Sequence, residues 1–142
     1  MDQRLSLVTL GVEDLDRAVA FYRDVLGWTP AARPPGVAFF DLDGVVLSLW
    51  PHADLAAELG LAPDVAPYRG MTLAHNLRSR AEVDALFDTL RERGAEITRS
   101  PTETEWGGYS GYFSDPDGHR WEVAHNPGWP LAEDGRVLLP HG

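Results

Sequence analysis

The sequence predicts an α+β protein of two β-α-β-β-β modules whose strands form a curved mixed sheet around a cup-shaped cavity. Three observations support this prediction. The 142 residues with 44% hydrophobic content suit one compact domain. Strand and helix periodicities recur in the same order in both halves, and one turn motif occurs twice. We expect one domain over residues 1–142, with helices on the outer face, because each amphipathic helix must bury its apolar side.

The first module is predicted over about residues 5–50. Residues 5–12 read as a strand, and Asp14 can cap a helix whose apolar side chains follow helical spacing. Gly27 is placed to end that helix. This helix is therefore expected to pack one face on the sheet.

The second module is predicted over about residues 70–126 and repeats this order. Residues 71–77 are strand-like, and Ser79 with Glu82 forms a capping box before the next apolar-periodic helix. Gly94 follows that helix as its expected end. Both halves therefore begin with a strand followed by a helix.

The repeated motif is Asp-x-Asp-Gly. Residues 39–44 correspond position by position to residues 113–118, and each segment precedes a strand-like run, at 45–50 and at 119–124. Asp and Gly in this spacing favour a tight turn between antiparallel strands. A calcium loop would need further ligands that the sequence lacks.

Two segments lie outside the modules. Residues 51–67 form a linker with a short helical piece at 54–59, flanked by Pro and Gly. Residues 127–142 are also punctuated by Pro and Gly, so we expect this tail to wrap the surface.

Charge and composition limit the partners. A net charge of −10 repels nucleic acid and anionic membranes, so a neutral or cationic ligand fits better, although acidity can also serve solubility alone. The absence of Cys excludes disulfides, thiolate metal sites and a cysteine nucleophile. No apolar run approaches the roughly 18 residues of a membrane span, and no secretory signal is recognised, so we expect a cytoplasmic protein.

Several motifs resemble those of the vicinal-oxygen-chelate superfamily, which includes glyoxalases, bleomycin-resistance proteins, fosfomycin-modifying enzymes and extradiol dioxygenases. They are residues 12–15 leading into 20–28, residues 94–97, and residues 113–122. The resemblance covers nearly the whole chain and implies the paired-module fold. It does not imply one reaction, because members of a fold family carry out different chemistries.

The resemblance also implies four metal-ligand positions, usually His or Glu, on the first and last strand of each module. These positions hold Leu7, Ser48, Thr72 and Glu122 here. Catalytic transition-metal sites take about three protein ligands, and only Glu122 is a competent one. We therefore expect no metal or other cofactor, with a divalent metal on rearranged ligands as the alternative.

Strand alternation places Thr72 and Asn76 on one face, and Glu122 and Asn126 on the corresponding face of the last strand. If these strands pair in parallel, as in the family, Thr72 lies near Glu122 and Asn76 near Asn126. These four polar residues then line the cup. There the Glu122 carboxylate either acts as a general base or only accepts hydrogen bonds from its neighbours.

Two histidines fall on the opposite, helix-covered face. His75 and His125 are offset equally from Thr72 and Glu122, which predicts that they lie side by side. A histidine metal site is one interpretation. Neutral rings hydrogen-bonded to each other or to backbone are commoner on a core face.

Aromatic side chains are the remaining candidates for a ligand site. Residues 105–113 combine Trp106, Tyr109 and Tyr112 with three glycines, and these rings can line a pocket beside Trp50. The alternative is a bulged strand whose aromatics pack the core.

Two functions remain open, with a protein-binding module as a third reading. The first is a homodimer that binds a small aromatic or cationic organic molecule without metal, with Leu7, Ser48 and the aromatic residues at the site, as in the bleomycin-resistance branch. The second is a lyase, isomerase or dioxygenase-like enzyme that uses Glu122 as base or metal ligand.

Overall fold

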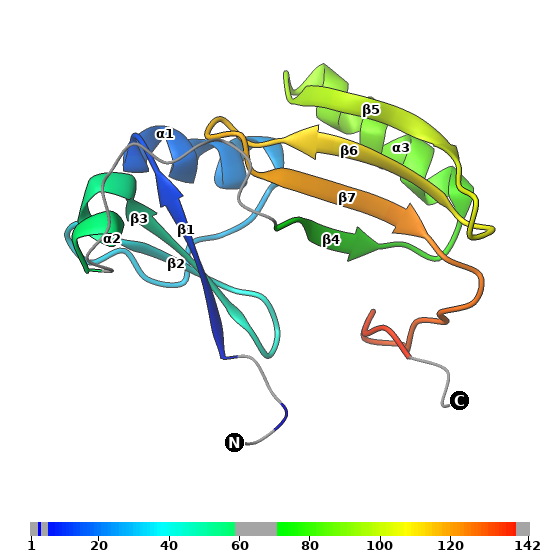
Figure 1. The fold of residues 1–142 in the computed structure, drawn as a ribbon, viewed down its shortest axis with the longest axis horizontal. Coiled ribbons are helices and arrows are strands. Elements are labelled where there is room, and N and C mark those ends of the chain that lie inside the picture. The colour runs from blue at the N-terminus through cyan, green and yellow to red at the C-terminus, as the bar shows by residue number, and fades with distance from the viewer. Residues whose placement is uncertain (1–2, 4–5, 59–70, 139–142) are drawn as a thin grey trace. The chain divides into compact units, whose positions relative to one another are not determined.

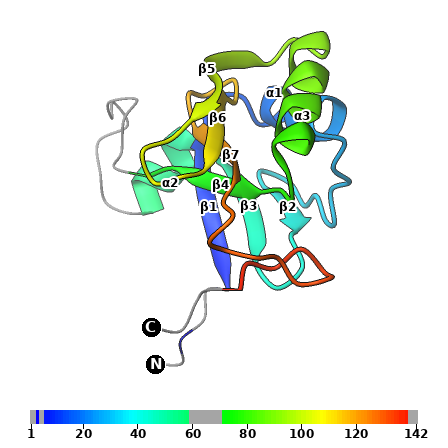
Figure 2. The ribbon, with the colours of Figure 1, turned by 90° about the vertical axis from the view of Figure 1, so that its right-hand side faces the viewer.

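The computed structural model describes residues 3, 6–58 and 71–138. The chain divides into two compact units, Met1–Pro67 and Tyr68–Gly142. Their boundary coincides with the end of the predicted linker, so each unit contains one of the predicted modules. The two units are described separately below (Figures 1 and 2).

Unit 1 contains a three-stranded sheet with a helix on one face. The elements are β1 (Leu7–Val12), α1 (Leu15–Ala20), the π-helical turn η1 (Phe21–Val25), β2 (Ala38–Asp41), β3 (Val46–Pro51) and α2 (His52–Glu58). The strand order is β1-β3-β2, with β1 parallel and β2 antiparallel to β3. The carboxylate of Asp14 accepts the N–H of Arg17 at 2.9 Å, so the predicted helix cap is confirmed.

The sequence predicted three strands after the first helix, but unit 1 has only two, β2 and β3. The prediction of a strand before β2 is wrong. Only an isolated bridge between Ala32 and Phe39 stands in its place within the described residues. Pro34 and Pro35 follow Ala32 and lack the N–H groups that a longer ladder would need. The predicted linker helix is present as α2, although it begins at His52 rather than Asp54.

The core of unit 1 lies between its sheet and α1. Leu10, Leu47 and Leu49 from the sheet are almost fully buried, as are Val19 from α1 and Tyr22 from η1. Because strand side chains alternate, the neighbouring positions on β1 and β3 project from the other face. That second face is available to line a pocket.

Unit 2 contains all five elements in the predicted order. They are β4 (Leu73–Asn76), α3 (Arg80–Glu92), β5 (Glu96–Glu103), β6 (Tyr109–Ser114) and β7 (Arg120–His125). The strand order is β4-β7-β6-β5, with β4 parallel to β7 and the other pairs antiparallel. Figure 1 shows α3 along one face of this sheet.

The start of α3 follows the predicted capping box. The hydroxyl of Ser79 accepts the N–H of Glu82 at 3.1 Å, and the Glu82 carboxylate accepts the N–H of Arg78 at 2.7 Å. The helix then buries Val83, Phe87 and Leu90. Phe113 and Trp121 are also buried, with their rings stacked and their centroids 6.2 Å apart.

Both Asp-x-Asp-Gly segments join antiparallel strands, which confirms the turn prediction. The two turns nevertheless differ in length. Asp41 pairs with Val46 in unit 1, whereas the last pair in unit 2 is Ser114 with Arg120, so the second loop is one residue longer. The sequence correspondence between the segments therefore does not extend to strand pairing.

Among the described helices, none combines the length and the apolar character that a bilayer crossing requires.

Candidate functional site

The open face of the unit 2 sheet carries a carboxylate held by a phenol. Glu122 is paired with Ala74 on one side and with Tyr112 on the other, so these three side chains share a face. The Tyr112 hydroxyl donates to Oε2 of Glu122 at 2.8 Å, and both residues are half-buried. Among the described residues, Oε1 of Glu122 has no hydrogen-bond partner.

The hydrogen bond to Glu122 shifts the pKa of the Tyr112 hydroxyl. It is the main reason why the pKa of Tyr112 is raised, and burial adds to the effect. Tyr112 therefore keeps its proton and acts as the donor of this hydrogen bond.

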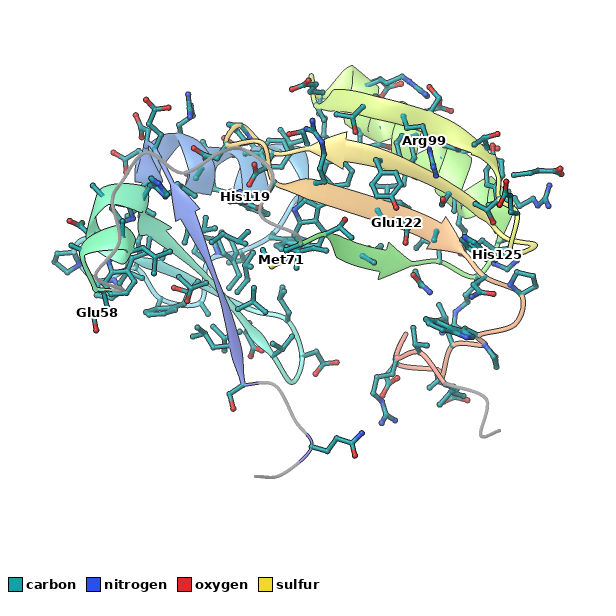
Figure 3. The ribbon with its side chains drawn as sticks, in the orientation of Figure 1. Glu58, Met71, Arg99, His119, Glu122 and His125 are labelled. Carbon is teal, nitrogen blue, oxygen red and sulfur yellow. The ribbon has the colours of Figure 1, made fainter. Side chains whose placement is uncertain are left out.

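A third residue of this cluster, Arg99, was missed by the sequence analysis. Its guanidinium carbon lies 4.7 Å from the centroid of the Tyr112 ring, and its Nη2 donates to the carbonyl and hydroxyl oxygens of Ser110 at 3.0 and 2.6 Å. Figure 3 labels Arg99 on β5 and Glu122 on β7 of the same sheet. The pairing of β5 with β6 is irregular on both sides of Arg99, so alternation alone does not place it.

The parallel pairing of β4 with β7 is confirmed, but the predicted register is wrong by two residues. Ala74, rather than Thr72, stands opposite Glu122. Thr72 lies two residues before Ala74, and its hydroxyl donates to the Arg120 carbonyl at 3.2 Å. A shift of two keeps every side chain on its predicted face, so periodicity cannot detect it.

The same shift separates the two predicted amides. Asn76 is opposite Ala124 instead of lying beside Asn126. Asn126 follows β7, where its side-chain oxygen accepts the N–H of Gly128 at 2.9 Å. Asn126 therefore organises a turn.

The paired arrangement of His75 and His125 is also wrong, because His75 stands opposite Val123. Nδ1 of His125 lies 3.2 Å from the Leu77 carbonyl, a backbone hydrogen bond of the kind expected on this face.

Two of the candidate aromatics in unit 2 lie apart from Glu122. Tyr109 is directed toward α3, where its hydroxyl donates to Asp84 at 2.6 Å and the Arg80 guanidinium lies 5.3 Å from its ring centroid. Trp106 is 52% exposed in the turn between β5 and β6. Its ring covers Gly108 so closely that a Cβ there would come within 1.7 Å of it.

Unit 1 has a pocket of about 490 Å³ on its open sheet face. Three predicted residues, Leu7, Ser48 and Trp50, line it together. Its other lining residues are Thr9, Pro35, Gly36, Val37, Phe39 and Asp54. The pocket therefore combines two aromatic rings with one carboxylate.

The four family ligand positions do not fit a metal ion. Leu7 has no donor atom, Ser48 offers a buried hydroxyl, and the Thr72 hydroxyl is donated to a carbonyl. Glu122 alone supplies a carboxylate, whereas about three protein ligands are usual. Within the part of the chain that is described, no group of three or more His, Asp or Glu residues is arranged to hold a metal ion.

Comparison with known proteins agrees with the fold. Residues 4–123 match the family described as Glyoxalase/Bleomycin resistance protein/Dioxygenase superfamily. The metallothiol transferase FosB of Shouchella clausii is 33% identical over 122 residues, which cover 82% of this chain and 75% of the relative.

Two solved structures extend the likeness. A glyoxalase-related enzyme from Fulvimarina pelagi is 38% identical with a TM-score of 0.87, and the match covers 98% of this chain and 99% of that one. A lactoylglutathione lyase from Agrobacterium tumefaciens is 27% identical with a TM-score of 0.73, covering 93% and 100%. The chain belongs to the glyoxalase/bleomycin resistance protein/dioxygenase superfamily.

Proposed function

We propose that this chain binds a small aromatic or cationic organic molecule in the unit 1 pocket, without a metal ion at the four family ligand positions. The observation that carries the proposal is the gathering of Leu7, Ser48 and Trp50 around one cavity of about 490 Å³. This volume lies in the usual range of small-molecule sites, roughly 300–1,000 Å³.

The lining also supports the class of ligand. Trp50 and Phe39 offer aromatic surfaces for stacking or for attraction of a cation, and Asp54 adds a carboxylate at the rim. Leu7, which has no donor atom, adds apolar contact surface. A flat molecule with a positive group would use both parts of this lining.

Trp50→Ala is expected to weaken binding of aromatic amines by about tenfold, because it removes the largest stacking surface of the pocket. The measurement is titration calorimetry with a panel of cationic and neutral aromatic compounds. Trp106→Ala removes an exposed Trp elsewhere and serves as the matched control, with unchanged affinity. Absence of saturable binding to any compound would refute the proposal.

Metal retention tests the other half of the proposal. Protein purified without a metal-affinity tag and incubated with iron, nickel, manganese or zinc is expected to retain far less than stoichiometric metal, because three of the four positions lack a strong donor. The measurement is elemental analysis after desalting. Near-stoichiometric metal that disappears in Glu122→Ala would contradict the expectation.

A second candidate is an enzyme in which Glu122 acts as general base. Its support is the Glu122 carboxylate, oriented by Tyr112 and half-buried on an open sheet face. The relatives are named as metallothiol transferase and lactoylglutathione lyase. Assays of this candidate therefore begin with glutathione, small electrophiles and lactoylglutathione.

A further inference from the structure

The sheet wall of the unit 1 pocket carries two hydroxyl groups on neighbouring strands. Ser48 of β3 stands opposite Thr9 of β1 on one side and opposite Phe39 of β2 on the other. Because residues directly opposite each other project to the same face, these three side chains form one row across the sheet, and all three line the pocket. Apart from Asp54, the rest of the lining has no polar side chain.

The Ser48 hydroxyl is nearly buried and has no partner among the described residues. Ser48 is 3% exposed, yet neither its hydroxyl nor that of Thr9 forms a hydrogen bond with any other described side chain or backbone group. A buried hydroxyl without a hydrogen bond costs free energy, and most such groups in proteins are paired. Since Ser48 lines a cavity of about 490 Å³, a ligand in that cavity can supply the missing bond.

An aromatic ring stands next to this hydroxyl. Trp50 follows Ser48 by two residues on the same face of β3, which separates the two residues by roughly 7 Å. That spacing is comparable to the length of a substituted benzene ring. A ligand ring that stacks on Trp50 can therefore carry a substituent that reaches Ser48.

The charge of the pocket comes from one carboxylate. Asp54 lies in the first turn of α2, is exposed, and forms no hydrogen bond or ion pair with any described residue. Among the described residues that line the pocket, none is Lys, Arg or His. A cationic group of a ligand therefore competes with no side chain of this lining for the Asp54 carboxylate.

We infer that the ligand of this pocket is an aromatic amine whose ring also carries a hydroxyl group. The ring stacks on Trp50, the ring hydroxyl bonds with Ser48, and the ammonium group faces Asp54. A phenolic hydroxyl suits Ser48 because each of the two groups can both donate and accept a hydrogen bond. The inference rests on the proposed function and narrows it, since aromatic cations without a hydroxyl group also satisfy that function.

Titration calorimetry with three related compounds tests the inference. Tyramine has both the ring hydroxyl and the amine, phenethylamine lacks the ring hydroxyl, and tyrosol has a neutral hydroxyl in place of the amine. Tyramine is expected to bind the wild type about tenfold more tightly than either analogue, because each analogue loses one polar contact with the pocket.

Two variants assign these contacts to their residues. In Ser48→Ala, the advantage of tyramine over phenethylamine is expected to disappear. In Asp54→Asn, the advantage of tyramine over tyrosol is expected to disappear. Ser100→Ala changes an exposed Ser on β5 of unit 2 and serves as the matched control, in which both differences remain.

Stability gives a second readout for Ser48. Because its hydroxyl has no partner among the described residues, Ser48→Ala is not expected to lower the free energy of unfolding, which urea denaturation measures. A clear loss of stability would show that the hydroxyl serves the fold, and would overturn the inference.

The calorimetry separates failure of the inference from failure of the proposed function. Saturable binding of tyramine and phenethylamine with equal affinity would overturn the inference and leave the proposed function standing. A tyramine advantage that survives in Ser48→Ala would do the same. Absence of binding by these three compounds and by every other compound of the aromatic panel would overturn both.

Discussion

Glu122→Gln is expected to reduce turnover by about 10²- to 10⁴-fold if this chain is an enzyme, because the base is removed while its shape is kept. The amide oxygen of Gln can still accept the hydrogen bond that Tyr112 gives to Glu122 at 2.8 Å. Ligand binding is therefore expected to change little. The measurement is the kinetics of the wild type and the variant with the substrate panel named above.

Two further variants separate a base from a merely structural carboxylate. Tyr112→Phe removes the donor but leaves the carboxylate, so a smaller loss of turnover is expected. Glu92→Gln changes an exposed carboxylate on α3 and is expected to have no effect. Unchanged turnover in Glu122→Gln would rule out the general-base role.

The variant also gives a spectroscopic signal that a change in folding alone would not produce. Because the hydrogen bond to Glu122 is the main cause of the raised pKa of Tyr112, the pKa in Glu122→Gln is expected to move back toward its ordinary value. Ultraviolet titration of the tyrosines, with Tyr112→Phe as the reference, measures this change.

Gly111→Ala is expected to lower the free energy of unfolding by about 3 kcal/mol, at the upper end of the cost of overpacking a core. A Cβ at this position would lie 2.6 Å from Cζ of Phe87, 2.9 Å from the Arg99 carbonyl oxygen and 2.9 Å from the Pro101 nitrogen. Two of these atoms belong to backbone, so the sheet itself must shift. Urea denaturation of the two proteins measures the loss.

Gly94→Ala is the matched control. Gly94 has a positive φ of 81°, but a Cβ there would meet nothing within 4 Å. Its substitution is expected to cost only the left-handed backbone preference, about 1 kcal/mol. If Gly111→Ala lowers the free energy of unfolding no more than Gly94→Ala does, the close contacts that β5 and α3 make with Gly111 are contradicted.

The local features of the fold could be predicted because they depend on residues near in sequence. Helix capping by Asp14 and Ser79, the two Asp-x-Asp-Gly hairpins and the burial of alternate strand positions follow from short patterns. The absence of a strand between the first helix and β2 could also have been recognised, since Pro34 and Pro35 stand where backbone N–H donors were needed.

The candidate site was predicted in part for the same reason. Alternation placed Glu122 on the open face, but Arg99 reaches that face only through an irregularity in β5, which has no simple sequence signal. The position of the C-terminal segment also depends on Arg78, whose guanidinium donates to backbone carbonyls more than fifty residues later in the chain. Contacts of that range are absent from any local pattern.

The sequence by itself determined the order of the elements in unit 2, the faces of the residues in its regular strands, and the lack of metal-ligating side chains at three family positions. Tertiary structure alone decided the register of β4 against β7, which moved Ala74 into the place expected for Thr72. The physical reason is that strand periodicity repeats every two residues, so registers that differ by two bury the same faces. They are distinguished only by packing and hydrogen bonds between segments distant in the chain.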